Sequence, residues 1–495
     1  MPRILPISKL RRLGDFFLDC GYTEDGLRQV LRDPFPHGTP PTKVALLLDT
    51  DGQPSPLTTI VRLFTLAMPV SRQQVRDILP EWVVDDCRKA GLLTEEESSF
   101  RSYFRVDPVG RTLLVCDSPA GGPVGHDIVS GHNPFAARLL NLTPRRPVED
   151  ALDAFCGGGV QALHLAKHCE CVSATELNPR AIRFAELNAG LNGIEKIRWL
   201  RGDRLAPVAG RQFDLIVANP PFFIGPNLAH LYSDNEMQLD AFCRDVVKQC
   251  AMHLKPGGHL FCLAEWVELE GEAWRDRLSG WFEGTGCDAW VLTTYRSIPD
   301  RYAQRRLLEA IDPDEPESQT ALKERVDYLR AAGVTRILGG AIFLRRRQGK
   351  NWIEVDDYPV EITGPCGEEI LNGFARRDFL SKHPSDEQLL QSRLVVSEAV
   401  RLEEIRRLEE SARPPEVQRL RVGNGMKYRA KVNNAIAGLL RRCDGSRTLN
   451  EVLGSGGETQ LFPDDNQARL LDTVRRLIRR GVLEPEPASS QGRTI

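Results

Sequence analysis

The sequence predicts an α/β fold in which a mostly parallel sheet occupies the middle of the chain. Strand-like and helical segments alternate between residues 150 and 345, and a glycine-rich turn directly follows the first of these strands. The segments before and after this region follow different patterns. Alternating strands and helices form a parallel sheet with helices on both faces, so we expect a Rossmann-like centre with a smaller domain on each side.

The central elements follow one another with short connections. The strands expected from their apolar runs are Ala151 to Phe155, Cys171 to Glu176, Ile197 to Arg201, Phe213 to Ala218, Gly258 to Ala264, Trp290 to Tyr295 and Gly339 to Arg345. Helical segments at Val160 to Lys167, Pro179 to Asn188 and Leu239 to His253 separate the earlier strands. We therefore predict a seven-stranded sheet in a domain that spans residues 126–349.

The first 125 residues read as a separate, mainly helical domain. Helices are expected at Thr58 to Met68, Ser71 to Leu79 and Glu81 to Ala90, with Ser71 as an N-cap. Strand-like alternation follows at Phe100 to Val106 and at Arg111 to Cys116. Three helices and a hairpin have the outline of a winged helix. The alternative is a helical cap that only packs on the next domain.

The last third of the chain changes character again. Residues 350–420 are expected to connect two domains and to contain a charged helix from Val400 to Ala412. Residues 421–495 are expected to form a small, α-rich, winged-helix-like domain that ends in a disordered tail. Its helices are predicted at Lys431 to Arg441, Leu449 to Leu453 and Asn466 to Arg480.

Composition excludes several functional classes. The chain has 495 residues and a net charge of −3, which is unlike a uniformly basic nucleic-acid binder. Its 12 cysteines include no C-x-x-C pair, so we expect no metal and a reducing compartment. No apolar run approaches the roughly 18 residues of a membrane span, so we expect a cytoplasmic protein without a membrane partner.

A ligand site is predicted where the first central strand ends. The segment Leu152-Asp153-Ala154-Phe155-Cys156-Gly157-Gly158-Gly159 leads from a strand into a helix, whose first N–H groups have no partner within the helix. Glu176 ends the next strand, 23 positions after Asp153, and can accept hydrogen bonds from ribose hydroxyls. Asp203 follows the third strand.

A dinucleotide site is the main competitor for this pattern. The fingerprint G-x-G-x-x-G needs a glycine three positions after its second glycine, and Ala162 stands there. The chain also shows no second mononucleotide-binding half. We therefore favour S-adenosylmethionine over a nicotinamide cofactor.

Residues 150–223 resemble class I methyltransferases. The common opening of that family is D-x-G-x-G-x-G. This chain has Phe155 at the first glycine, as in the D-x-F-x-G-x-G variant of several RNA and DNA methyltransferases. The resemblance implies that Asp153, Phe155, Gly157 and Gly159 hold the amino-acid end of the cofactor. It also implies that Glu176 holds the ribose and that Asp203 holds the adenine amine.

The motif Asn219-Pro220-Pro221-Phe222 follows the fourth strand. An NH2 group conjugated to a ring or carbonyl is a poor nucleophile, because its lone pair is delocalised. The Asn219 side-chain oxygen and the Pro220 carbonyl can accept its two hydrogens, and the prolines stiffen the loop. Phe222 can stack on a planar acceptor. Residues 148–265 are thereby similar to the amino-methyltransferases with a [D/N]-P-P-[Y/F/W] motif.

The substrate stays open between two classes. Members of that group methylate adenine N6, guanine N2 or the glutamine of release factors, and Phe in place of Tyr favours the ribosomal-RNA enzymes. Basic residues near the C-terminus could contact phosphates or form a solvated face: Arg413, Arg419, Arg421, Lys427, Arg429, Lys431, Arg441, Arg442, Arg447, Arg475, Arg476, Arg479 and Arg480. An RNA base is the preferred acceptor. A translation-related protein and a binding module without turnover are the alternatives.

Overall fold

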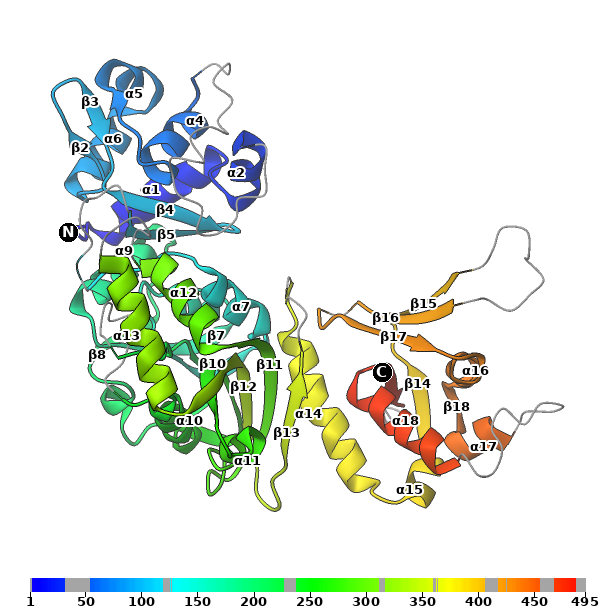
Figure 1. The fold of residues 1–495 in the computed structure, drawn as a ribbon. Coiled ribbons are helices and arrows are strands. Elements are labelled where there is room, and N and C mark those ends of the chain that lie inside the picture. The colour runs from blue at the N-terminus through cyan, green and yellow to red at the C-terminus, as the bar shows by residue number, and fades with distance from the viewer. Residues whose placement is uncertain are drawn as a thin grey trace. The chain divides into compact units, whose positions relative to one another are not determined.

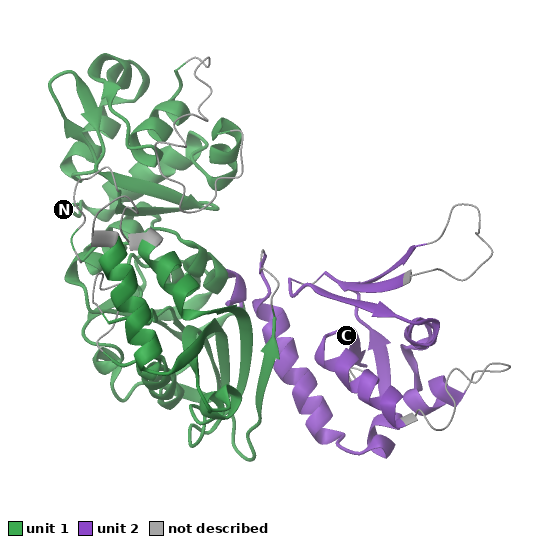
Figure 2. Ribbon diagram, viewed as in Figure 1, with its two compact units in different colours: residues 1–140, 146–359 green, residues 141–145, 360–495 purple. Residues whose placement is uncertain are grey.

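The chain forms two compact units, which Figure 2 shows in different colours. Unit 1 contains residues 1–140 and 146–359, and unit 2 contains residues 141–145 and 360–495. The computed structural model describes residues 2–31, 54–118, 125, 127–226, 237–310, 317–358, 362, 364–405, 417–423, 425–454 and 467–486. The end of the predicted charged helix, with Arg413, lies outside these residues, as does most of the predicted disordered tail.

An eight-stranded sheet forms the centre of unit 1 (Figure 1). Its order is β13-β11-β12-β10-β9-β6-β7-β8. The strands are β6 (Val148–Ala154), β7 (Cys169–Glu176), β8 (Ile197–Arg201), β9 (Phe213–Ala218), β10 (Leu254–Leu269), β11 (Cys287–Ser297), β12 (Val334–Arg346) and β13 (Ile353–Asp357). Only β12 runs antiparallel to its neighbours. The Rossmann-like, mostly parallel sheet is thus confirmed.

The predicted count of seven strands is wrong. β13 pairs in parallel with β11 and extends the sheet past residue 349, where we expected the domain to end. The Trp290 indole reinforces this pairing, because its Nε1 donates to Asp356 Oδ2 at 3.0 Å. Isoleucine and valine alternate with acidic residues in β13, a short pattern typical of an edge strand.

The helices of this region occur before and between the strands along the chain. They are α7 (Pro134–Leu142), α8 (Val160–Leu165), α9 (Pro179–Leu191), the 3₁₀ turn η3 (Ala206–Val208), α10 (Ala241–Met252), α11 (Trp274–Ser279), α12 (Pro299–Ala310) and α13 (Glu317–Ala331). The chain proceeds from β6 through β7 to β8 and then returns to β9 on the other side of β6. In such sheets a crevice opens at the carboxyl ends of the strands where the order reverses, here β6 and β9.

The N-terminal part of unit 1 is helical with two small sheets. Its helices are α1 (Ile7–Asp19), α2 (Glu24–Leu31), α4 (Pro56–Ile60), the π-helical η1 (Val61–Thr65), α5 (Arg72–Ile78) and α6 (Glu81–Lys89). One sheet has the order β1-β3-β2, made of β1 (Val70–Ser71), β2 (Thr94–Glu95) and β3 (Ser99–Arg101). The Ser71 hydroxyl accepts from the Gln74 N–H, which confirms the predicted N-cap.

The predicted hairpin needs a correction at its first strand. Phe100 lies in β3, whereas the hairpin consists of β4 (Phe104–Val109) and β5 (Thr112–Asp117). Buried Ser102 separates β3 from β4, since its hydroxyl donates to the Phe104 carbonyl and accepts from the Phe104 N–H. A side chain that bonds to neighbouring backbone in this way interrupts strand pairing.

Helix α9 joins this N-terminal part to the sheet domain. Its apolar side chains share one core with Leu10, Leu13 and Phe17 of α1. Asn188 of α9 and Asn192, the C-cap of this helix, lie one turn apart and pair with the free edge of β5. Asn192 accepts from the Leu113 N–H and donates to the Leu113 carbonyl. Asn188 does the same with Val115 and also donates to the Gly158 carbonyl at 2.9 Å. Two amides therefore take the place of a third strand.

Unit 2 contains more strand than the α-rich domain that we expected. Its helices are α14 (Gly367–Lys382), α15 (Asp386–Leu390), α16 (Asn434–Arg442), α17 (Leu449–Gly454) and α18 (Gln467–Arg479). One sheet has the order β18-β14-β19, made of β14 (Arg393–Val396), β18 (Asp444–Thr448) and β19 (Leu483–Pro485). The other has the order β15-β16-β17, made of β15 (Val400–Ile405), β16 (Val417–Val422) and β17 (Tyr428–Val432).

The predicted charged helix from Val400 is wrong over its described part. Val400 and Leu402 point toward the core of unit 2, while Arg401 and Glu403 are exposed. This is a period of two, and the strand it forms pairs with β16. The dense charges of the following residues conceal that short alternation in the sequence.

Replacing Asn188 by aspartate tests the joint between the two parts of unit 1. Asn188 is 1% exposed, and its amide nitrogen faces two carbonyls. A carboxylate oxygen in that place would repel both, so we expect a loss of about 3 kcal/mol in the free energy of unfolding. Denaturant titration measures it, with exposed Arg183→Gln on the same helix as control. Equal stability of N188D and the wild type would contradict this role.

Candidate functional site

A cavity of about 590 Å³ lies at the carboxyl ends of the central strands. Its wall combines the loops that follow β6, β7, β8 and β9 with residues 128–133, which precede α7. Of the predicted site residues, it brings together Phe155, Gly157, Glu176, Asp203, Asn219 and Pro221. These residues come from four separate loops, and the crossing order of the sheet places them at one site.

The Glu176 carboxylate fixes the glycine turn. Its Oε2 accepts from the Gly157 N–H at 2.9 Å and its Oε1 accepts from the Asn178 N–H at 2.8 Å. Burial raises the pKa of this carboxyl, and the same backbone donors oppose the shift. The turn itself requires glycine at 159, where φ is 85° and a Cβ would lie 2.8 Å from the Trp199 ring.

Asp153 lies behind the cavity wall instead of lining it. The residue is 1% exposed, and its Oδ2 accepts from the Ala162 N–H at 2.8 Å. Burial raises the pKa of its carboxyl to about 8, while the Ala162 N–H lowers it. A carboxyl whose pKa rises on folding makes the fold less stable as the pH increases from about 4 toward 8. The structure thus gives Asp153 a contact with α8, not the direct ligand contact that we expected.

Phe155 supplies an aromatic part of the wall at a cost in backbone strain. Its φ is 63°, a region that non-glycine residues rarely occupy, which accounts for the glycine found there in the common form of the motif. Its ring lies 6.0 Å from that of Phe242, which in turn lies under the Arg204 guanidinium at 5.1 Å. Sequence reasoning missed Phe242, which is distant from the motifs in the chain, and Arg204, which directly follows Asp203.

The Asn219 motif divides between the cavity and the core. Asn219 and Pro221 line the cavity, and Asn219 Oδ1 is a buried atom without a hydrogen-bond partner. Pro220 and Phe222 are buried and are not part of the wall. The Phe222 ring packs edge-on against Phe135 and Phe223, each with centroids 5.2 Å away. We therefore correct the expectation that Phe222 stacks on the acceptor, because its ring is used in packing.

A buried polar cluster that no sequence motif indicates holds the end of this loop. The Tyr302 hydroxyl accepts from the Ile224 N–H at 2.8 Å and donates to the Glu265 carboxylate. Arg306 pairs with the same carboxylate, and its guanidinium lies 3.2 Å from the centroid of the Phe223 ring. Both charged side chains are 1% exposed. A buried ion pair of this kind is costly to break, so it keeps Phe223 and Ile224 in place.

Residues of the segment 128–133 form part of the cavity wall, and ion pairs and hydrogen bonds hold this segment and the preceding Asp127. Arg180 of α9 forms a two-pronged ion pair with Asp117, at the end of β5. Asp117 Oδ2 also accepts from the Val129 N–H at 2.7 Å. The Asp127 carbonyl accepts from Asn178 Nδ2 at 2.9 Å. The N-terminal hairpin and the loop after β7 therefore both position this wall.

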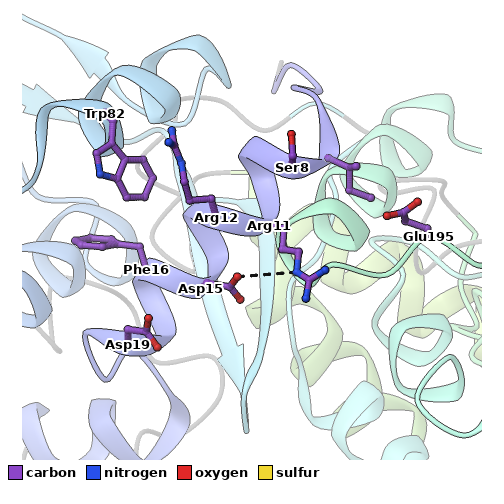
Figure 3. Close-up of a pocket in the computed structure, with 9 residues that line it drawn as sticks. Ser8, Arg11, Arg12, Asp15, Phe16, Asp19, Trp82 and Glu195 are labelled. Carbon is purple, nitrogen blue, oxygen red and sulfur yellow. Dashed lines mark ion pairs between the residues drawn. The ribbon is translucent and has the colours of Figure 1, made fainter.

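Two other clusters of charged side chains in the described residues are held by ion pairs. A hollow of about 480 Å³ between α1 and α6 contains Arg11, which pairs with Asp15 (Figure 3), and Arg12, which pairs with Asp86 and stacks on Trp82 at 4.0 Å. The carboxylates of Glu149, Asp150 and Asp214 lie close enough to bind a cation, and the Lys255 ammonium already pairs with all three.

Comparison with known families identifies the central region. Residues 135–268 match the family model described as "Methyltransferase small domain". This region is a class I methyltransferase domain. The cofactor of such domains is S-adenosylmethionine, and the domain is related to ribosomal-RNA and glutamine methyltransferases. Residues 19–103 and 371–485 match two models described as domains of unknown function, DUF7059 and DUF7782.

Curated relatives match the methyltransferase domain only in part. The release factor glutamine methyltransferase of Deinococcus radiodurans is 32% identical over 158 residues, which cover 29% of this chain and 55% of that protein. The ribosomal protein uL3 glutamine methyltransferase of Bradyrhizobium diazoefficiens is 29% identical, covering 28% and 47%. The ribosomal RNA small subunit methyltransferase C of Alcanivorax borkumensis is 30% identical, covering 25% and 34%. The chain thus spans about half the length of these relatives, or less.

Solved structures were compared as well. A methyltransferase from Pyrococcus furiosus aligns with a TM-score of 0.27 and 16% identity, over 44% of this chain and 89% of that chain.

The described residues contain no helix that is long and apolar enough to cross a membrane.

The cavity suits S-adenosylmethionine in its polar groups. Glu176 offers a carboxylate at the end of β7 for ribose hydroxyls, and Asp203 offers a second one, with a side chain 67% exposed, on the loop after β8. Phe155 and Phe242 supply apolar surface between them. Asn219, a residue of the cavity wall, has a buried Oδ1 atom without a hydrogen-bond partner.

Replacing Glu176 by glutamine tests the cofactor site. The amide keeps the size of the side chain but removes the charge and one acceptor. We expect S-adenosylhomocysteine to bind at least about 10-fold more weakly, since hydrogen bonds to a charged group contribute roughly 1.5–3 kcal/mol. Calorimetric titration measures the affinity, and E186Q, on α9 outside the cavity, is the matched control. An unchanged dissociation constant for E176Q would rule out this ribose contact.

Proposed function

We propose that this chain is an S-adenosylmethionine-dependent N-methyltransferase that acts on a planar NH2 group. The observation that carries the proposal is the buried, unpartnered Oδ1 of Asn219, which belongs to a residue of the cofactor cavity wall. Leaving a buried acceptor unpaired costs about 1–3 kcal/mol, which a substrate donor would recover. The matched methyltransferase domain and its amino-methylating relatives support the same chemistry.

In the proposed mechanism Asn219 acts on the substrate nitrogen. Its Oδ1 accepts one N–H of the acceptor group. The Pro220 carbonyl is proposed to accept the other, which requires the substrate nitrogen to approach between Asn219 and Pro221, because Pro220 is buried and is not part of the cavity wall. These bonds draw the nitrogen out of conjugation and direct its lone pair. Bound cofactor supplies the methyl group together with its own leaving group, so positioning and electrostatics provide most of the acceleration. Pro221 and the Tyr302–Ile224 hydrogen bond keep the loop rigid.

The preferred acceptor is an exocyclic amine of an RNA base. Relatives of the domain include a ribosomal-RNA methyltransferase, and several arginines and lysines of unit 2 are exposed. The alternative acceptor is a glutamine of a translation protein, which the release-factor and uL3 relatives favour.

For the N-terminal part we propose a winged-helix-like shape, because helices α5 and α6 precede the short strands β2 and β3.

Asn219→Ala separates catalysis from cofactor binding. We expect the turnover number to fall by about 10²–10³-fold, the loss typical of removing one positioned hydrogen-bonding group in a transition state. Affinity for S-adenosylhomocysteine should stay within about two-fold. N219D keeps an acceptor oxygen and is expected to retain more activity than N219A. Full activity of N219A would refute the proposed contact of Asn219 with the substrate nitrogen. Loss of cofactor binding by N219A would show that Asn219 has a structural role instead.

Labelling of a cell extract distinguishes the two substrate classes. Purified protein and cofactor with a tritiated methyl group are added to extract, and the product is digested with RNase or with protease. We expect RNase to release the label and protease to leave it in acid-insoluble material, with N219A as the blank. Label that survives RNase but not protease would reject RNA and support a protein acceptor.

A further inference from the structure

The three-stranded sheet β15-β16-β17 of unit 2 has one apolar and one charged face. Leu420 and Val422 of β16 are 1% exposed and belong to the core of unit 2, and Leu402 of β15 packs against that core. Side chains alternate across a strand, so the residues between these positions point away from the core. Every described residue at those positions is exposed.

Strand register arranges the outward residues in two rows. Arg401 lies opposite Arg421, which lies opposite Arg429. In the second row Glu403 lies opposite Arg419, which lies opposite Lys431. The two rows therefore hold five cations and one carboxylate in a flat array. We call these six residues the basic face.

The basic face is costly for the protein alone. Opposed side chains in antiparallel strands lie about 5 Å apart, and like charges at that distance destabilise the sheet. The ion pair within the basic face offsets little of this like-charge repulsion: Glu403 pairs with Arg421 at 3.6 Å, and both side chains are 50% exposed. Arg401 bonds to the carbonyls of Glu398 and Val400. Arg419, Arg429 and Lys431 have no ion-pair partner among the described residues.

We propose that the basic face binds the phosphate backbone of RNA. Closely spaced cations on neighbouring strands gain from a polyanion, because each phosphate contact releases condensed counterions. The two rows contain no aromatic side chain, so the face contacts phosphates and does not stack on bases. This inference deepens the proposed function by assigning an RNA-holding surface, and it rests on that function only for the identification of the RNA as substrate.

Two other partners fit the face less well. An anionic membrane would gain from apolar side chains among the cations, and the only large one beside the rows in the described residues is Ile405 at the end of β15. An acidic protein would have to present carboxylates to all five cations of the two rows, and Glu403, at the end of the second row, faces the same partner. Both partners are outcomes of the test below.

The test uses the triple variant R419Q/R429Q/K431Q of the full chain. The matched control is K382Q/R469Q/R476Q, which removes three exposed cations from helices of the same unit. Binding of an unmodified single-stranded RNA 20-mer is measured by fluorescence anisotropy between 0.05 and 0.5 M salt. We expect the triple variant to bind about 100-fold more weakly near 0.1 M salt and its log–log salt slope to fall by about 2, at roughly 0.7 per lost contact.

Further readouts separate binding from folding and from catalysis. Thermal unfolding of the triple variant should occur at the same or a higher temperature than in the wild type, because repulsion is removed. Affinity for S-adenosylhomocysteine should not change. Equal RNA binding by the triple and control variants would overturn the proposal, as would a selective loss of binding to polyglutamate or to anionic phosphatidylserine vesicles. No cofactor turnover is needed, so failure of the proposed methyltransferase function would show instead as absent activity with intact RNA binding.

Discussion

The cavity of unit 1 depends on one carboxylate that accepts hydrogen bonds from two loops. Glu176 binds the Gly157 N–H after β6 and the Asn178 N–H after β7, so the turn and the start of α9 move as one body. Asn188, nearly three turns further along α9, donates to the Gly158 carbonyl and pairs with Val115 of the N-terminal hairpin. The N-terminal part is therefore linked to the glycine turn that follows β6. A substitution in either of these regions is expected to affect the other.

Much of the fold follows from local sequence patterns. The parallel strands are continuous apolar runs with glycine or proline at their ends, which is why β6 to β10 could be predicted. Short strands are harder, because two or three alternating residues carry little information. β13 and β15 were missed for this reason, and only pairing with β11 and β16 makes them strands. The bend at Ser102 depends on a side-chain hydrogen bond that no periodicity reveals.

The site was predictable where chemistry and spacing coincide in the chain. Glu176 and Asn219 follow strands of the sheet, and both line the cavity. Contacts between distant segments could not be inferred. Phe222 was predicted to stack on the methyl acceptor, yet its ring packs against the rings of Phe135 and Phe223. Tyr302 lies 78 positions from its partner Ile224, and only the folded sheet brings them together.

We propose that the cofactor binds in this cavity with its reactive end at Asn219. A crystal structure with S-adenosylhomocysteine tests it directly. We expect the ribose hydroxyls to contact Glu176 and the sulfur to face the cavity wall at Asn219 and Pro221. A ligand whose sulfur lies away from Asn219, or a ligand bound outside the loops that follow β6, β7 and β9, would contradict this placement of the cofactor.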